Sequence, residues 1–311
     1  MKLPAPFLQL PLRYDADVLA AEIEALGEGP WRPHPAGFPG NSMLRLLALE
    51  GEAADEGYAG RMLPTPELQR CPYLLQVMAS FGATLGRTRL MRLAGQAEVT
   101  RHVDQGYYWA ERVRIHVPVV TQPTVRFECG GDAINMAAGE CWIFDTWRQH
   151  RVLNDATRSR IHLVADTVGG GDFWRLVARS RLVPGPDPGD QWQPALVAPA
   201  PGAMPELALE TVNIPVVMSP WEMDAHFRLV FGEADPHPHL GAAVAAARHF
   251  GLEWKGLWMR YGTAPEGRDA YRAAMQAFLD RIENDAAPIQ LRNGVNCLSA
   301  IRTIIAKVAV A

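Results

Sequence analysis

Short segments of alternating apolar and polar residues run from about residue 87 to residue 168, separated by Gly, Asn and Asp. Because successive side chains of a strand point to opposite faces, this alternation predicts strands that each have one apolar face. Strands so short and so closely spaced favour a closed or two-sheet β architecture. The chain is therefore expected to fold around a mainly β core.

The second face of these strands is ionisable. Arg112, Arg114 and His116 share one face of a predicted strand, and aliphatic residues take the other. If the ionisable face lines the interior of a barrel, its cations need partners, because unpaired charge is very costly to bury.

Strand and helix patterns also precede this region. We expect strands over residues 7–14 and 42–51 and helices over residues 15–26 and 65–82. Pro72 interrupts the second of these helices, because proline removes a backbone donor.

The last third of the sequence is helical in pattern. A segment rich in Pro, Gly and Ala, residues 183–205, is the best candidate for a linker. It divides an expected β domain with N-terminal helices, residues 1–182, from an expected helical domain, residues 206–311. Within the latter, Ser219 and Glu222 form a capping-box signal that predicts the start of a helix.

Bulk composition excludes several classes of protein. A formal net charge of -4 and a pI near 6.1 give no electrostatic case for a nucleic-acid partner. The sequence shows neither a signal peptide nor an apolar run long enough to span a membrane, which favours a cytoplasmic location. The 4 cysteines form no C-x-x-C pair and suit reduced thiols.

A metal-binding pattern lies within the β region. His102 and Asp104 share one face of a strand, and His150 follows on a later strand. Two histidines and one carboxylate form a facial triad that leaves positions on Fe(II) open for a 2-oxo acid and O2. A structural zinc site closes its fourth position instead. We therefore expect an iron(II) site, the alternative being a chance H-x-D pair with a later histidine.

Arg160 suggests the co-substrate. On the strand after His150, Arg158, Arg160 and His162 are expected to share a face. Two neighbouring strands then present cations to one interior, and a dianion such as 2-oxoglutarate supplies their partners. The alternative is that these arginines pair with Asp and Glu on a solvated face.

These residues together resemble a known family. The run GECWIFDTWRQHRVLNDATRSR at 139–160, with HVD at 102–104 and RVRIH at 112–116, resembles the aspartyl/asparaginyl β-hydroxylase domain of the iron(II)/2-oxoglutarate-dependent oxygenases. The resemblance covers roughly residues 85–168. It implies a double-stranded β-helix of the jelly-roll or cupin-like kind, with flanking helices.

The resemblance also implies roles for single residues. His102, Asp104 and His150 would bind iron, and three further residues would contact 2-oxoglutarate: Arg114, His116 and Arg160. Arg112 would face an acidic group of the substrate. The vertebrate enzyme lacks the carboxylate ligand, whereas Asp104 fills that place here, as in bacterial relatives that include free-proline hydroxylases. Halogenating relatives leave the position open, so the complete triad favours hydroxylation.

Tyr107 and Trp109 lie in the loop beside the triad. Such aromatic residues suit the wall of a substrate pocket, with core packing as the alternative.

The sequence thus predicts a 2-oxoglutarate-dependent dioxygenase that uses Fe(II) and O2 and releases succinate and CO2. The expected substrate is an amino acid or peptide side chain of the Asp or Asn kind. A lipid or free-proline hydroxylase of the same family, and a non-catalytic organic-acid-binding β-barrel, are the alternatives. The C-terminal helices are expected to form either a lid or a homodimer interface.

Overall fold

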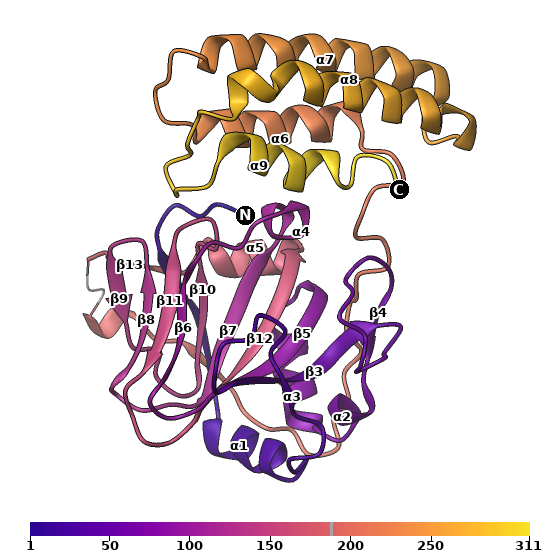
Figure 1. Ribbon diagram of the computed structural model, residues 1–311. Coiled ribbons are helices and arrows are strands. Elements are labelled where there is room, and N and C mark those ends of the chain that lie inside the picture. The colour runs from indigo at the N-terminus through magenta and orange to yellow at the C-terminus, as the bar shows by residue number, and fades with distance from the viewer. Residues whose placement is uncertain (187–188) are drawn as a thin grey trace. The chain divides into compact units, whose positions relative to one another are not determined.

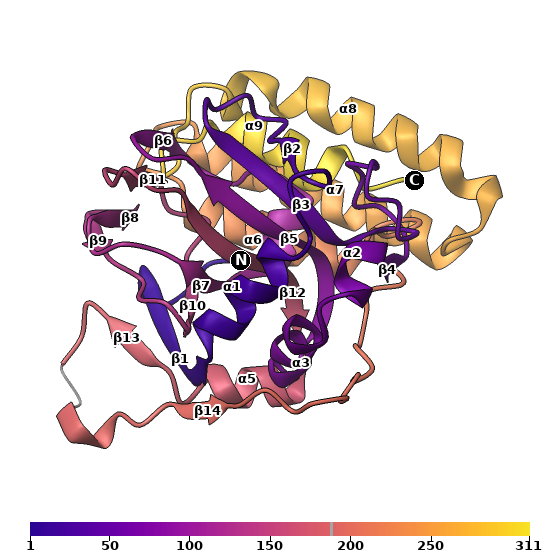
Figure 2. The same cartoon turned by 90° about the horizontal axis from the view of Figure 1, so that it is seen from below.

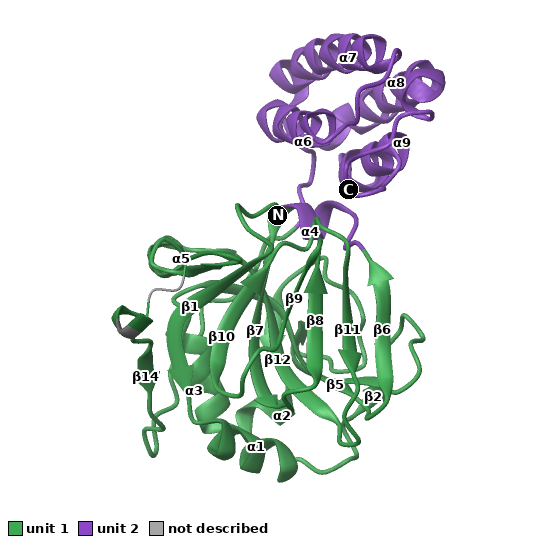
Figure 3. Cartoon of the chain, turned by 90° about the vertical axis from the view of Figure 1, so that its left-hand side faces the viewer, with its two compact units in different colours: residues 1–102, 111–213 green, residues 103–110, 214–311 purple. Residues whose placement is uncertain are grey.

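The computed structural model describes residues 1–186 and 189–311. The chain forms two compact units (Figure 3). The barrel unit comprises residues 1–102 and 111–213, and the helical unit comprises residues 103–110 and 214–311.

Two β-sheets form the barrel unit (Figure 1). The large sheet has the strand order β13-β1-β10-β7-β12-β5-β3-β2, with β14 beside β1 and β4 beside β3. Its strands are β1 (Phe7–Tyr14), β2 (Arg32–Pro33), β3 (Asn41–Leu49), β4 (Met62–Pro64), β5 (Thr84–Leu93), β7 (Val113–Val120), β10 (Glu140–Phe144), β12 (Arg160–Gly169), β13 (Arg181–Val183) and β14 (Ala195–Val197). The small sheet, in the order β6-β11-β8-β9, has β6 (Ala97–His102), β8 (Val125–Cys129), β9 (Asp132–Ile134) and β11 (His150–Asn154). This is the predicted double-stranded β-helix.

The strands of the large sheet have two different faces. On β7 and β12, Ile115, Val117 and Leu163 belong to an apolar cluster that also contains Leu19 and Ile23. The latter two come from a helix packed on the outer side of the sheet. The alternate residues of the same strands face the interior between the sheets, as the sequence pattern predicts.

Short helices flank the barrel, and α1 and α3 lie side by side in Figure 2. They are α1 (Ala16–Glu24), α2 (Pro66–Gln69), α3 (Pro72–Ser80), α4 (Tyr107–Glu111, which joins the two units along the chain) and α5 (Gly171–Val177), with a 3₁₀ turn at Gly189–Gln191. Asp15 caps α1 by accepting a hydrogen bond from the backbone N–H of Val18. Pro72 takes the first position of α3, so the single helix expected over 65–82 is two helices.

The described residues of the segment expected as a linker, 183–205, belong to the barrel unit. β13 and β14 both pair with β1, and residues 187–188 lie outside the described residues. The chain passes from one compact unit to the other after Asn213 rather than within 183–205. Backbone pairing with an edge strand explains this difference, because Pro and Gly do not prevent short strands at a sheet edge.

The helical unit contains α6 (Pro220–Gly232), α7 (Leu240–Tyr261), α8 (Arg268–Ala286) and α9 (Cys297–Ile301), with a 3₁₀ turn at Pro265–Gly267 and a π-helical turn at Arg302–Ala306. Ser219 accepts a hydrogen bond from the backbone N–H of Glu222, as the capping-box signal predicts. The rings of Phe250 and Phe278 stack at 4.2 Å and join α7 to α8. In the described part of the chain, no helix has both the length and the apolar character needed to cross a membrane.

Candidate active site

Two histidines meet where strands of the small sheet lie side by side. His102 ends β6 and His150 begins β11, and the pairing of these strands places the two residues opposite each other. Their ring centroids are 4.3 Å apart. Two positions distant in sequence thus present imidazoles to one point.

The backbone fixes which ring nitrogen each histidine offers. The Nδ1 of His102 lies 2.7 Å from the carbonyl oxygen of Thr100, and the Nδ1 of His150 lies 3.0 Å from that of Arg148. A carbonyl only accepts, so each Nδ1 carries the proton and donates. Each Nε2 is then unprotonated, and an unprotonated ring nitrogen is the form that binds a metal.

Asp104 completes the group. One ligand atom from each of His102, Asp104 and His150 lies within 4.8 Å of the others, and no other group of this kind occurs in residues 1–186 and 189–311. Two neutral imidazoles and one carboxylate suit Fe(II) in a facial arrangement. The donor set present therefore fits the metal that the sequence predicts.

A tight turn before β11 positions His150. The carboxylate of buried Asp145 accepts hydrogen bonds from the backbone N–H of Trp147 and from Nε of Arg148, both at 3.1 Å. Burial raises the pKa of Asp145, and these donors oppose that rise. The turn holds the Arg148 carbonyl in the place where it orients the His150 ring.

The inner face of β12 carries a buried arginine. Arg160 is only 4% exposed and forms no ion pair in the described part of the chain. Among the described residues its one side-chain hydrogen bond runs from Nη1 to the carbonyl oxygen of Met91 at 3.5 Å, and its Nε has no hydrogen-bond partner there. Burial lowers its pKa to about 10, so the guanidinium stays charged at neutral pH. An anionic ligand fits this position, because a buried cation needs a counter-charge.

Two histidines lie beside Arg160. His116 of β7 and His162 of β12 are buried, and their Nδ1 atoms are 3.4 Å apart. Burial, and next the charge of Arg160, hold the pKa of both well below the ordinary range. Phe144 packs against the ring of His116 at 5.3 Å and that of His150 at 4.9 Å, so one aromatic ring bridges this pair and the metal ligands.

A second group of cations surrounds one carboxylate. Arg87 and Arg89 of β5 lie 3.7 and 3.6 Å from the Asp166 carboxylate, and Arg114 of β7 lies 3.1 Å from it. Burial, and next Arg89, Arg114, Arg87 and His102, lower the pKa of His34 to about 4. After burial, the cations of this group are thus the next cause of the lowered pKa of His34.

Arg112 has a partner within the protein. It forms a bidentate pair with Glu210 at 2.8 and 2.9 Å, and both side chains are 3% exposed. The substrate-facing role expected for Arg112 stays a prediction, and Glu210 already supplies the counter-charge that burial demands.

Two aromatic residues of the predicted pocket wall lie in the segment 103–110. Tyr107 donates a 2.6 Å hydrogen bond from its hydroxyl to Glu222 of α6, and its ring contacts that of His226. Trp109 is half-buried against Tyr108. Their substrate roles also stay predictions.

Arg158 differs from its predicted position. It is exposed in a bend before β12, which begins at Arg160, so it does not share the inner face with Arg160 and His162.

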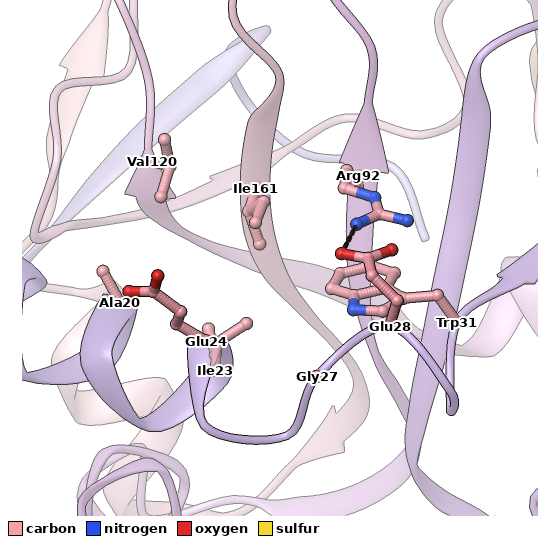
Figure 4. A pocket seen from close by; sticks show the side chains of 9 residues that line it. All are labelled: Ala20, Ile23, Glu24, Gly27, Glu28, Trp31, Arg92, Val120 and Ile161. Carbon is pink, nitrogen blue, oxygen red and sulfur yellow. Dashed lines mark hydrogen bonds and ion pairs between the residues drawn. The ribbon is translucent and has the colours of Figure 1, made fainter.

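A separate pocket of about 280 Å³ lies on the outer side of the large sheet (Figure 4). Val120 and Ile161 form part of its lining, and Arg92 lies over the ring of Trp31 at 4.2 Å and pairs with Glu28. Ile161 points away from the face that carries Arg160, so this pocket is distinct from the metal-binding group.

Sequence reasoning missed Arg87, Arg89 and Asp166. The alternation in the sequence of β5 contains the signal for the two arginines, which share a face with Met91. The sequence around Asp166 and Glu210 does not predict their ion pairs, because the partner of a carboxylate depends on strand pairing or on contacts distant in sequence.

Comparison with known proteins agrees with this geometry. The sequence model of the aspartyl/asparaginyl β-hydroxylase family matches residues 58–169. No curated protein sequence matches the chain.

Several solved structures are similar to it. A 2OG-Fe(II) oxygenase family oxidoreductase from Burkholderia pseudomallei has 17% identity and a TM-score of 0.37, over 48% of this chain and 78% of that one. A prolyl-4-hydroxylase from Pseudomonas putida has 18% identity and a TM-score of 0.37, over 53% and 92%. A predicted oxalate decarboxylase from Thermotoga maritima has 15% identity and a TM-score of 0.28, over 44% and 89%.

The family match includes both histidines, Asp104 and Arg160, the same residues that the fold brings to one interior. Residues 58–169 thus match the aspartyl/asparaginyl β-hydroxylase family, and this match together with the His–Asp–His group supports a 2-oxoglutarate-dependent dioxygenase.

Proposed function

We propose that this chain hydroxylates an unactivated C–H bond of an amino acid or peptide side chain that bears a carboxylate, with release of succinate and CO2. One observation carries the proposal: a His–Asp–His group shares its interior with Arg160, a buried cation that forms no ion pair within the described residues. An open-faced metal site beside an anion-binding site suits a metal-bound 2-oxo diacid.

The protein's own residues act by binding and orientation. His102, Asp104 and His150 would hold Fe(II), which when bound supplies the activation of O2. Arg160 would take the distal carboxylate of 2-oxoglutarate, with Arg114 and His116 as further contacts. The rings of Phe127 and Phe144, which are buried beside His150, keep water from the interior.

The excess of arginines around Asp166 supports a carboxylate on the substrate. Three guanidinium groups lie within 3.7 Å of the Asp166 carboxylate, and their field extends to His34. We assign the attraction of the substrate carboxylate to Arg87 and Arg89. Arg112, Tyr107 and Trp109 remain predicted substrate contacts.

Succinate release tests the proposal. The iron-loaded protein is mixed with 2-oxoglutarate and air in the presence of free amino acids, short acidic peptides or hydroxylatable lipids. We expect acidic amino acids or peptides to stimulate succinate release and to gain one oxygen by mass, and Asp104→Ala to abolish both effects. Stimulation by lipids or by free proline would replace the proposed substrate class. No stimulation, with no visible charge-transfer band for iron and 2-oxoglutarate without air, would favour the non-catalytic organic-acid-binding barrel.

A cytoplasmic location and a homodimer through the C-terminal helices belong to the proposal as predictions. The molecular mass in solution tests the second.

A further inference from the structure

The histidine pair beside Arg160 has unused hydrogen-bonding capacity. His116 and His162 are 4% and 2% exposed, and the Nε2 atoms of both lack a hydrogen-bond partner in the described part of the chain. A buried polar atom without a hydrogen-bond partner destabilises the fold. Two such atoms next to a buried cation indicate that a ligand completes this cluster.

The pairing of the rings determines what they offer. Each neutral imidazole carries one proton, on either Nδ1 or Nε2. Because the two Nδ1 atoms face each other at 3.4 Å, one Nδ1–H donates a hydrogen bond and the other, unprotonated Nδ1 accepts it. The accepting histidine must then carry its own proton on Nε2. The pair therefore always has one Nε2–H donor and adds no charge to that of Arg160.

Strand geometry brings this donor to the same interior as the guanidinium. Arg160 and His162 are two residues apart on β12 and share its inner face. His116 lies opposite Val164 on the neighbouring strand β7. The cluster thus combines one positive charge with one neutral N–H donor, which matches a single carboxylate group.

We infer that His162 is a further co-substrate-binding residue, which with Arg160 recognises the distal carboxylate of the 2-oxo acid and so selects a diacid over a monoacid. This inference rests on the proposed function. The Nε2–H of His162 donates to the carboxylate of the ligand, whereas its Nδ1 accepts the hydrogen bond from His116.

Binding to the Co(II)-loaded protein tests this inference without turnover. The dissociation constants of 2-oxoglutarate and of 2-oxovalerate, which has the same carbon chain but no distal carboxylate, are measured by calorimetry. In His162→Phe we expect 2-oxoglutarate to bind about tenfold or more weakly, and 2-oxovalerate to bind as it does to the unaltered protein.

Two conservative variants separate the ring nitrogens. His162→Gln places an amide near the position of Nε2, and His162→Asn places one near that of Nδ1. We expect Gln to keep the preference for the diacid and Asn to lose it. His226→Gln, a buried histidine of the helical unit, is the matched control and should leave both affinities unchanged.

The outcomes are distinct. If the unaltered protein binds no 2-oxoglutarate, the proposed function fails. If it binds 2-oxoglutarate and the His162 variants either keep the diacid preference in full or lose both acids equally, His162 is a structural residue and the inference is overturned.

Discussion

Arg112 and Arg160 are both buried, and they differ in what balances their charge. Glu210 pairs with Arg112 through two hydrogen bonds, whereas the one side-chain hydrogen bond of Arg160 within the described residues goes to the carbonyl oxygen of Met91. A guanidinium in a bidentate pair with its own carboxylate stabilises the fold, whereas a buried guanidinium without a carboxylate of its own needs one from a ligand.

Replacement of Arg112 is therefore expected to act on stability. Arg112→Ala leaves the Glu210 carboxylate buried without a partner, which costs about 3–5 kcal/mol. Urea unfolding of Arg112→Ala and of the double variant Arg112→Leu with Glu210→Leu measures the effect, and the double variant should lose much less. Normal stability of Arg112→Ala with a raised KM for substrate would instead make Arg112 the substrate anchor.

Arg89 is expected to act on the substrate. Arg89→Gln removes one cation of the Asp166 cluster, so the KM for an acidic substrate should rise about tenfold, while the dissociation constant of 2-oxoglutarate stays the same. Arg126→Gln, which removes an exposed arginine paired with Asp155, is the control. Equal kinetics for the two variants would remove Arg89 from substrate recognition.

At the scale of single elements, β7 and β12 show what alternation predicts. The ionisable faces with Arg114, His116 and Arg160 were predictable, because each strand needs an apolar face for the helix layer. The start of β12 was not, and Arg158 lies outside it. Local sequence carries the period of a strand, but the residue at which pairing begins depends on the neighbouring strands.

Ion pairs between residues distant in sequence could not be predicted from the sequence either. Glu210 reaches Arg112 from 98 residues away, and Asp166 meets Arg87 and Arg89 only because β12 pairs with β5. In the candidate site, the triad and Arg160 were predictable from residue types and spacing. The counter-charges were not, because several acidic residues would have suited each cation equally well.

A substitution at Gly139 tests the contact between β1 and the turn before β10. Its φ is +80°, and a Cβ there would lie 2.3 Å from the backbone oxygen of Tyr14. Gly139→Ala should cost at least about 2 kcal/mol in the free energy of unfolding, because both the backbone conformation and the contact oppose a side chain. Gly131→Ala, where a Cβ meets open space, is the matched control in chemical denaturation. Equal stability of the two variants would contradict this reasoning.

At the scale of the whole molecule, each compact unit contains buried histidines. His116 and His162 lie in the barrel unit and His226 in the helical unit, and burial is the largest cause that lowers the pKa of each. Protonation of these histidines in the folded state therefore lowers the free energy of unfolding of the unit that contains them.

Stability is therefore expected to fall on acidification. In the unfolded chain these histidines titrate near pH 6.5, so below that pH the unfolded state binds more protons than the folded state. Each buried histidine can remove up to about 1.4 kcal/mol per pH unit in this range. Urea unfolding of the metal-free protein at about pH 7 and about pH 5.5 measures the loss, which should be smaller in His162→Gln. A free energy of unfolding that is constant between these pH values would contradict the expectation.

The opposite faces of β12 have a consequence for how such a protein evolves. Leu163 and Ala165 belong to the hydrophobic cluster and Ile161 packs against it, whereas Arg160 and His162 face the interior that holds the candidate site. A point mutation at Arg160 or His162 is expected to change ligand selectivity without removing an apolar side chain from the cluster, so new activities can arise by single steps. A one-residue deletion within the strand exchanges the two faces and destroys both. Natural variation in this strand should therefore consist of substitutions, with changes of length confined to the loops around it.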